Sequence, residues 1–178
     1  DLFIPQSSKE TLQRQLESAV EKVDGSLVRE SDCELARIEA GIPKMGIDMT
    51  SEQLVQETGL TPSVISFSKG CYIGQEVISR IRTVGKVNKS LLRLAFDAVP
   101  NLDSDSVHVL KVEGKDAGFV TSLAAVSGHD PKIHGLGYVK RPYLEGDASF
   151  TLGETETSKV KIEIIGEPSP TGFFSQNA

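Results

Sequence analysis

The stretch Leu91-Leu92-Arg93-Leu94-Ala95-Phe96 decides the fold class of the second half of the chain. It is short, mostly apolar and bounded by polar residues, which is typical of a β-strand. Four further runs of this kind, rich in β-branched residues and separated by turns such as Glu113-Gly114-Lys115, cover residues 107–112, 119–123, 135–139 and 160–164. Short strands at this spacing predict a small antiparallel β-barrel or β-sandwich over residues 86–178.

The first half shows helical periodicity instead. Ser7 and Glu10 have the spacing of a capping box, and apolar residues at helical spacing follow it as far as Val23. A second helix is predicted from Ser31 to a glycine stop at Gly41. The remaining expected elements are strand segments at 2–5 and 26–29, a short helix at 51–57 and a helix at 75–82. Helices followed by strands predict an α+β protein, with residues 1–85 as its first domain and 86–178 as its second.

Composition narrows the class of protein. The chain has 178 residues, of which 38% are hydrophobic and 25% are charged, as in a soluble globular protein. Its net charge of -6 argues against a nucleic-acid-binding surface, so no nucleic-acid partner is expected. No apolar run approaches the roughly 20 residues of a membrane span. The chain begins at Asp1 within a predicted strand and without an initiator methionine, so we expect the C-terminal portion of a longer protein, whose missing N-terminal part would be a partner.

Cysteine usage indicates a reducing compartment. Cys33 and Cys71 are too few for a disulfide framework, and free thiols are their expected state. The sequence has no Cys-x-x-Cys or paired-histidine spacing, so no metal site is predicted. Bacterial cytoplasm, mitochondrial matrix and chloroplast stroma all fit this expectation.

The segment Lys69-Gly70-Cys71-Tyr72-Ile73-Gly74-Gln75-Glu76 is the main candidate for chemistry. Glycines on both sides of Cys71 keep the thiol uncrowded. Lys69 and the expected start of a helix favour a thiolate, because cations and helix N-termini lower thiol pKa values. Tyr72 offers a ring and a hydroxyl to a ligand. The alternative is a small buried cysteine that only packs, and the residues alone leave both interpretations open.

Two other groups of polar residues have two interpretations each. Glu76 and Arg80 have the spacing of a surface ion pair, and the basic run that continues to Lys89 is either a solvated face or an anion-binding surface. Arg37 complements the dipole at the end of its helix, or else Arg37 and Glu39 bind a carboxylate or a pterin-like ring. Cys33, between two acidic residues, is predicted to be structural.

Two blocks carry a resemblance to a known family. Residues 69–76, with Arg80 and Gly85-Lys86-Val87-Asn88-Lys89, resemble the signature of the folate-binding YgfZ family, which is associated with the maintenance of iron–sulfur enzymes. Arg37-Ile38-Glu39-Ala40-Gly41 looks like the motif of the wider superfamily that contains the glycine-cleavage T-protein, an aminomethyltransferase. T-proteins lack the cysteine block, so its presence favours the YgfZ branch.

The resemblance implies a tetrahydrofolate site within a three-part fold. Residues 1–85 would be the later part of a ferredoxin-like folate-binding domain, and residues 86–178 the C-terminal β-barrel. Arg37, with Glu39 beside it, would contact the folate, and Asp1 would match an acidic residue that T-proteins place on the pterin. Cys71 would be the functional cysteine, supported by Lys69, Tyr72, Gln75, Glu76 and Arg80. Without the first domain, the chain alone would bind folate poorly.

The function that the resemblance implies is that of a tetrahydrofolate-binding accessory protein for iron–sulfur cluster assembly or repair. Its partners would be folate and iron–sulfur client or assembly proteins. The first alternative is an aminomethyltransferase, against which Cys71 argues, because that reaction needs a carboxylate rather than a thiol. The second is a non-enzymatic interaction domain with a buried cysteine. The residues do not decide whether a folate-dependent, transferase-like turnover occurs.

Overall fold

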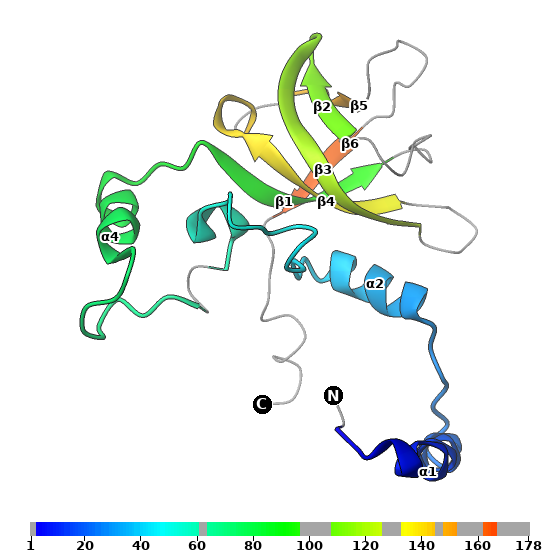
Figure 1. The fold of residues 1–178 in the computed structure, drawn as a ribbon. Helices are drawn as coiled ribbons and strands as arrows, with labels where there is room; N and C mark the ends of the chain where they lie inside the picture. The colour runs from blue at the N-terminus through cyan, green and yellow to red at the C-terminus, as the bar shows by residue number, and fades with distance from the viewer. Residues whose placement is uncertain are drawn as a thin grey trace. The chain divides into compact units, whose positions relative to one another are not determined.

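The computed structural model describes residues 3–60, 64–96, 108–125, 133–144, 148–152 and 162–166. The chain comprises two compact units, Asp1–Cys33 and Glu34–Ala178. Its helices, drawn in Figure 1, are α1 (Lys9–Glu21), α2 (Glu30–Glu39) and α4 (Gln75–Val84), with the short 3₁₀ helices η1 (Gln6–Ser8), η2 (Val55–Thr58) and η3 (Arg141–Tyr143). None of the described helices has the length and apolar character needed to cross a membrane.

The first unit contains an exposed amphipathic helix. α1 begins at Lys9 rather than after Ser7, because residues 6–8 form the 3₁₀ turn η1, and the Ser8 side chain makes no capping hydrogen bond. The predicted capping box is therefore wrong. None of the described α1 side chains is buried, and Leu16 is 44% exposed. Residues 3–5 and 26–29 are not strands, so those two predictions are wrong for the described residues.

Helix α2 has well-defined ends. The helix begins at Glu30, one residue before the predicted start at Ser31, and the Asp32 carboxylate accepts a 2.9 Å hydrogen bond from the backbone N–H of Arg29. At its end, Gly41 adopts a left-handed backbone with φ of +70°. The N–H of Gly41 bonds the Ile38 carbonyl, and the N–H of Ile42 bonds the Arg37 carbonyl. These two bonds define a Schellman motif, so the predicted glycine stop is confirmed.

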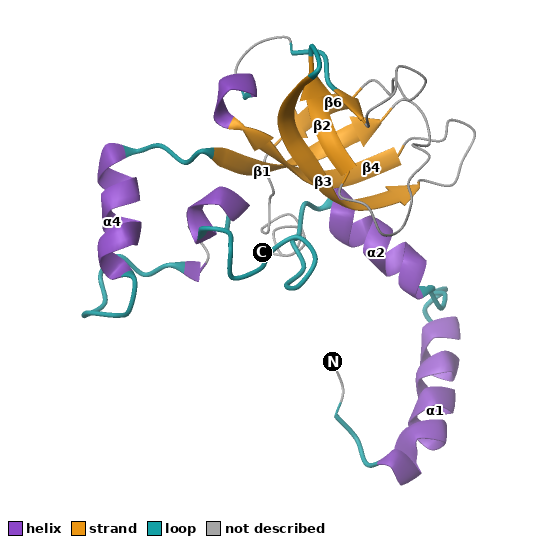
Figure 2. Ribbon diagram, turned by 45° about the horizontal axis from the view of Figure 1, so that its top comes forward, coloured by secondary structure: helices purple, strands orange, loops and turns teal. Residues whose placement is uncertain are grey.

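The second unit is built on one antiparallel sheet, shown in orange in Figure 2. Its strand order is β5-β2-β3-β4-β1-β6. The strands are β1 (Lys89–Phe96), β2 (His108–Val112), β3 (Lys115–Ala125), β4 (Ile133–Lys140), β5 (Thr151–Leu152) and β6 (Ile162–Gly166). All five runs predicted as strands lie wholly or partly in strands of the sheet, whereas the two-residue β5 was too short to be predicted. The hairpin between β2 and β3 turns at Glu113 and Gly114, both with positive φ, as a type I′ turn requires.

The predicted barrel is not seen in the described residues. β5 and β6 lie at the two ends of the strand order, and each pairs with a single neighbour there. With two residues in β5, that edge is too short to close the described sheet. The α+β class is confirmed. Before β1 the described residues contain helices, turns and one isolated bridge, so the ferredoxin-like arrangement is not confirmed. The division at residues 85 and 86 stays a prediction.

The core lies on both faces of strand β1. Consecutive side chains of a strand point to opposite faces. Leu92, Leu94 and Phe96 accordingly enter the main core of the sheet, whereas Leu91 packs with Leu136, Tyr138 and Ile38 of α2. Ile38 is 2% exposed and thereby attaches the last turns of α2 to the sheet. This contact places the end of α2, and the loop that follows it, against β3 and β4.

Candidate functional site

The Cys71 segment, residues 69–76, is exposed and ends in a tight turn. Cys71 is an exposed free thiol, so the interpretation that buries it is wrong. Gly74 has φ of +85°, a conformation that favours glycine, and the N–H of Gln75 bonds the Tyr72 carbonyl at 3.2 Å. α4 starts immediately after this turn, at Gln75. The thiol therefore lies about one helical turn before α4 rather than at its first residue.

The cations of this region contact aromatic rings. The Lys69 ammonium lies 4.9 Å from the centre of the Tyr72 ring, and the Arg82 guanidinium lies 4.1 Å from the centre of the Phe67 ring. Both distances are within the range of cation–π attraction. Phe67 is 39% exposed, so its contact with Arg82 lies on the surface. Lys69, two residues before the thiol, and Tyr72, directly after it, thus form a pair.

The rest of the predicted cysteine site is open to solvent. Gln75 is half-buried, whereas Glu76 and Arg80 are exposed. Glu76 and Arg80 do not form the predicted ion pair, and neither has an ion-pair partner among the described residues. Cys33 is also exposed, so the prediction of a structural role gains no support from burial. Differences in reactivity between the two thiols would therefore not arise from burial.

A second cluster surrounds Asp48, in the loop after α2. The Asp48 side chain is fully buried, and its carboxylate accepts four hydrogen bonds. Oδ2 accepts from the Arg37 guanidinium at 2.7 Å and from the backbone N–H of Lys44 at 2.9 Å. Oδ1 accepts from the hydroxyls of Thr121 and Ser122, the latter at 2.7 Å. A buried carboxylate is stable only when it is paired and hydrogen-bonded in this way.

A β-bulge in β3 allows two consecutive hydroxyls to reach the same oxygen. The pairing of β3 with β4 runs Val120 to Gly137 and then Ser122 to Leu136, which leaves Thr121 as the extra residue. In a regular strand the side chains of Thr121 and Ser122 would point to opposite faces. The bulge breaks this alternation, so both point at Asp48.

The Arg37 guanidinium makes most of its contacts inside this network. A guanidinium has five N–H donors. Three of them bond groups near Asp48: Nη1 donates to Asp48 Oδ2 and to the Ile42 carbonyl, each at 2.7 Å, and Nη2 donates to Ser122 Oγ at 3.0 Å. The other two face Glu34, from Nε at 3.0 Å and Nη2 at 2.9 Å. All three nitrogens of Arg37 therefore contact protein groups in this structure.

Glu34 links this network to the surface. It also accepts from Lys44 Nζ at 2.8 Å, so it lies between two cations. The hydrogen bond from Lys44, followed by the one from Arg37, lowers the pKa of Glu34 below its ordinary value. The carboxylate therefore stays ionised and ties α2 to the loop that holds Asp48.

Tyr138 closes the network from the sheet. Its hydroxyl donates to the Asp48 backbone carbonyl at 2.9 Å, and its side chain is completely buried. Burial, followed by the nearby carboxylates of Glu57 and Asp48, raises the pKa of Tyr138 well above its ordinary value. Tyr138 therefore acts as a neutral donor and not as a base.

The remaining predicted ligand residues lie at the edge of this network or outside the described structure. Glu39 Oε1 lies 3.2 Å from His134 Nδ1, without the alignment of a hydrogen bond, and its side chain is 43% exposed. Arg93 donates to the backbone carbonyl of Glu39 at 3.1 Å, at the end of α2. Asp1 lies outside the described residues. Among the described residues, no contact joins Arg37 or Glu39 to the Cys71 segment. The Arg37–Glu39 pair and the Cys71 segment are therefore two separate groups.

The sequence interpretation missed most of the network, including the carboxylate Asp48 and the hydroxyls of Thr121 and Ser122. The available signal was weak, since Asp48 follows Gly46 in a glycine- and proline-rich loop and the two hydroxyls interrupt an apolar strand. Their meeting depends on contacts more than 70 residues apart in sequence. Within the described residues, no group of three or more histidine, cysteine or acidic side chains is arranged to hold a metal ion.

Comparison with known proteins identifies relatives of this chain. It is 38% identical over 99 residues to the tRNA-modifying protein YgfZ of Yersinia enterocolitica, covering 54% of this chain and 29% of that protein. It is 30% identical over 129 residues to the same-named protein of Escherichia coli, covering 71% of this chain and 38% of that protein. The chain belongs to the YgfZ family. No family model matches it.

A plant relative extends the comparison. The chain is 36% identical over 124 residues to a chloroplastic protein of Arabidopsis thaliana whose name proposes a transferase, covering 68% of this chain and 27% of that protein. The chain spans between 27% and 47% of the length of the curated relatives that it matches. The relatives of this chain thus include both bacterial and chloroplastic proteins.

Proposed function

We propose that this chain is part of a tetrahydrofolate-binding accessory protein for iron–sulfur cluster assembly or repair, with Cys71 as its functional thiol. The observation that carries the proposal is the exposure of Cys71 between two glycines in a chain of the YgfZ family. An exposed thiol beside a lysine is free to act as a nucleophile or a ligand, which a buried one is not. Lys69, Tyr72, Gln75, Glu76 and Arg80 are the proposed supporting residues.

The residues predicted to hold tetrahydrofolate do not form a complete site in this chain. Arg37 makes four hydrogen bonds and an ion pair with protein groups, and Glu39 presents a partly exposed carboxylate beside His134. We propose that the folate site also draws on the part of the family's length that this chain does not span. Residues 1–85 would contribute to that folate-binding domain, and residues 86–178 would form a second domain.

The bacterial relatives' names include tRNA modification, whereas the net charge of -6 disfavours a tRNA-binding surface. An accessory protein that maintains a tRNA-modifying enzyme needs no such surface of its own. We therefore propose iron–sulfur client or assembly proteins, rather than tRNA, as the direct partners. The exposed thiol requires a reducing compartment, and a bacterial cytoplasm or a chloroplast stroma would meet that need.

The first test compares the two exposed thiols. Alkylation by iodoacetamide is followed by mass spectrometry in Cys33→Ser, which reports Cys71, and in Cys71→Ser, which reports Cys33. Both thiols are exposed, so a rate difference reports chemical environment rather than access. We expect Cys71 to react at least several-fold faster, and Lys69→Gln to reduce that advantage. Equal rates for the two thiols would remove the support for a functional Cys71.

The second test addresses folate. Tetrahydrofolate is titrated calorimetrically into the full-length protein that contains these residues, and we expect a dissociation constant of about 1 μM, near −8 kcal/mol. Cys71→Ser should retain this binding, because the thiol is proposed to act chemically and not as an anchor. If the wild-type protein gives no binding heat at any temperature tested, the folate proposal fails.

A second candidate is aminomethyl transfer to tetrahydrofolate, favoured by the transferase name of the Arabidopsis relative. That reaction would depend on carboxylates that position the substrate. Cys71→Ser would then leave the activity of the full-length protein unchanged, whereas the accessory function would lose it. The same variant therefore separates the two candidates.

A further inference from the structure

A cavity lies between two segments that the site described above does not use. Its volume is about 770 Å³, within the usual range of small-molecule sites. One wall is the segment of residues 85–88, which leaves α4 at Gly85, and the other is η3 together with Leu144. The backbone N–H of Arg141 donates to the Asn88 carbonyl at 2.8 Å, so a main-chain hydrogen bond joins the two walls.

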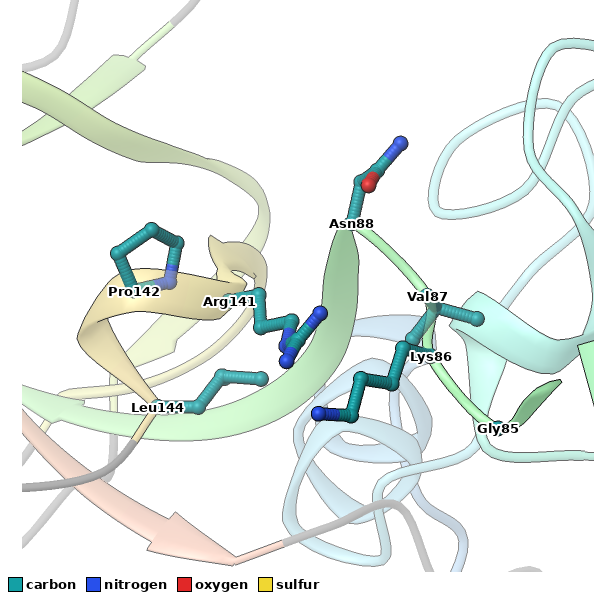
Figure 3. A pocket seen from close by; sticks show the side chains of 7 residues that line it. All are labelled: Gly85, Lys86, Val87, Asn88, Arg141, Pro142 and Leu144. Atoms are coloured by element: carbon teal, nitrogen blue, oxygen red, sulfur yellow. The ribbon is translucent and has the colours of Figure 1, made fainter.

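Two cations face this cavity from opposite walls. Figure 3 shows the side chains of Lys86 and Arg141 extending toward each other across it. Neither side chain has a hydrogen bond, an ion pair or a ring contact with another described residue. The neighbouring cations differ in this respect. Lys89 lies 4.9 Å from the centre of the Tyr138 ring, and Lys140 donates to the Asp116 carbonyl at 3.0 Å.

The chemistry of the cavity lining favours an anion. No carboxylate is among the described lining residues, although the chain as a whole carries a net charge of -6. Val87, Pro142 and Leu144 supply apolar surface beside the two cations. Apolar walls keep water away from a charged ligand and strengthen its attraction to the cations. Two like charges that converge without a counter-ion repel each other, and a bound anion would relieve that repulsion.

We propose that this cavity is an anion-binding site for a small ligand with clustered negative oxygens, either a phosphate group or a set of linked carboxylates. The Arg141 guanidinium would supply two parallel N–H donors, as it does for phosphate and carboxylate in general, and Lys86 a point charge from the opposite side. The site is separate from the Asp48 network and from the Cys71 segment. It does not depend on the function proposed above.

The test uses pyrophosphate and triglutamate as the two probes. Each is titrated into the isotope-labelled 178-residue chain at low ionic strength, and amide shifts are followed by NMR. We expect saturable shifts at residues 85–88 and 141–144 for at least one probe. The probe that binds more tightly shows whether the site prefers a phosphate group or linked carboxylates. Lys86→Gln and Arg141→Gln should each weaken binding about tenfold, the value of one charge-assisted hydrogen bond.

Controls make the result specific. Lys115→Gln removes an exposed cation from the β2–β3 turn and should change the affinity less than twofold. Unchanged amide shifts elsewhere in each variant verify that the fold is intact. Shifts that do not saturate with either probe, or that spread over all exposed lysines, overturn the proposal. An affinity that Lys115→Gln weakens as much as Arg141→Gln does would also overturn it, because binding would then reflect general charge.

Discussion

Replacing Asp48 by alanine should destabilise this protein more than any other single removal of a charge. The substitution takes away an acceptor for four hydrogen bonds, one of them from a guanidinium. It leaves Arg37, whose side chain is 14% exposed, without its buried partner. The two hydroxyls of β3 would then face a cavity instead of a carboxylate.

The expected loss of stability depends on the contacts that Arg37 keeps after the substitution. Breaking a buried ion pair by removing one partner costs about 3–5 kcal/mol. Arg37 keeps its two bonds to Glu34, which favours the lower end, so we expect a loss of about 3 kcal/mol for Asp48→Ala. Asp48→Asn keeps the volume, and hydroxyls can accept as well as donate, so its cost should be smaller, about 2 kcal/mol.

The assay is urea denaturation followed by far-ultraviolet circular dichroism, since the chain has no tryptophan. Asp116→Ala is the matched control, because Asp116 is an exposed aspartate of β3 and should change stability by no more than about 0.5 kcal/mol. Arg37→Met combined with Asp48→Asn should cost less than the sum of the two single changes, since it removes both charges. A loss below about 1 kcal/mol for Asp48→Ala would refute the reasoning, because such a value is typical of surface positions.

Three further predictions concern the sheet and its pH dependence. A Cβ atom on Gly118 would collide with the Tyr138 carbonyl, so Gly118→Ala should lower the free energy of unfolding by about 2 kcal/mol or more, whereas Gly70→Ala, with open space around it, should change it little. Because the hydrogen bond from Lys44 lowers the pKa of Glu34, this carboxylate stabilises the fold at neutral pH. That contribution should disappear as the pH falls below 4.5, so denaturation curves of wild type and Glu34→Gln should converge in acid. Burial raises the pKa of Tyr138, so the wild type should lose stability as the pH rises above 10.0, and Tyr138→Phe should lack that loss while costing about 1 kcal/mol at neutral pH.

Sequence patterns predicted the helix end and the hairpin turn that depend only on residues close together in the chain. Gly41 ends α2 through two backbone bonds within six residues, and Glu113-Gly114 turns β2 into β3 through two positive φ values. The strands were predictable because burial requires apolar side chains, which the sequence shows directly. Those of β1, for example, pack into two cores. The start of α1 was mispredicted, because a 3₁₀ turn at residues 6–8 competes with the capping box. The barrel was mispredicted because counting strands does not establish that the two edges pair.

The Asp48 network was beyond prediction from sequence for a different reason. Asp48 bonds hydroxyls that lie 73 and 74 residues away, and a bulge that no local pattern announces directs both hydroxyls to it. The Arg37 block was recognised, but its interpretation as a ligand fork took no account of competing protein acceptors. By contrast, the residues around Cys71 left an exposed and a buried thiol both open; the structure shows the exposed one, and the functional role of Cys71 stays a prediction.

The two blocks that carry the family resemblance therefore differ in how freely they can meet a ligand. The Cys71 thiol can meet a ligand without losing a hydrogen bond to another described residue. Arg37 can do so only by giving up part of its four hydrogen bonds and its ion pair with Glu34, at a cost of about 1–3 kcal/mol per hydrogen bond. A ligand that recruited Arg37 would thereby loosen the loop around Asp48. If folate binds through Arg37 in the full-length protein, hydrogen exchange at residues 44–49 should rise on binding; if folate binds elsewhere, exchange there should stay unchanged or fall.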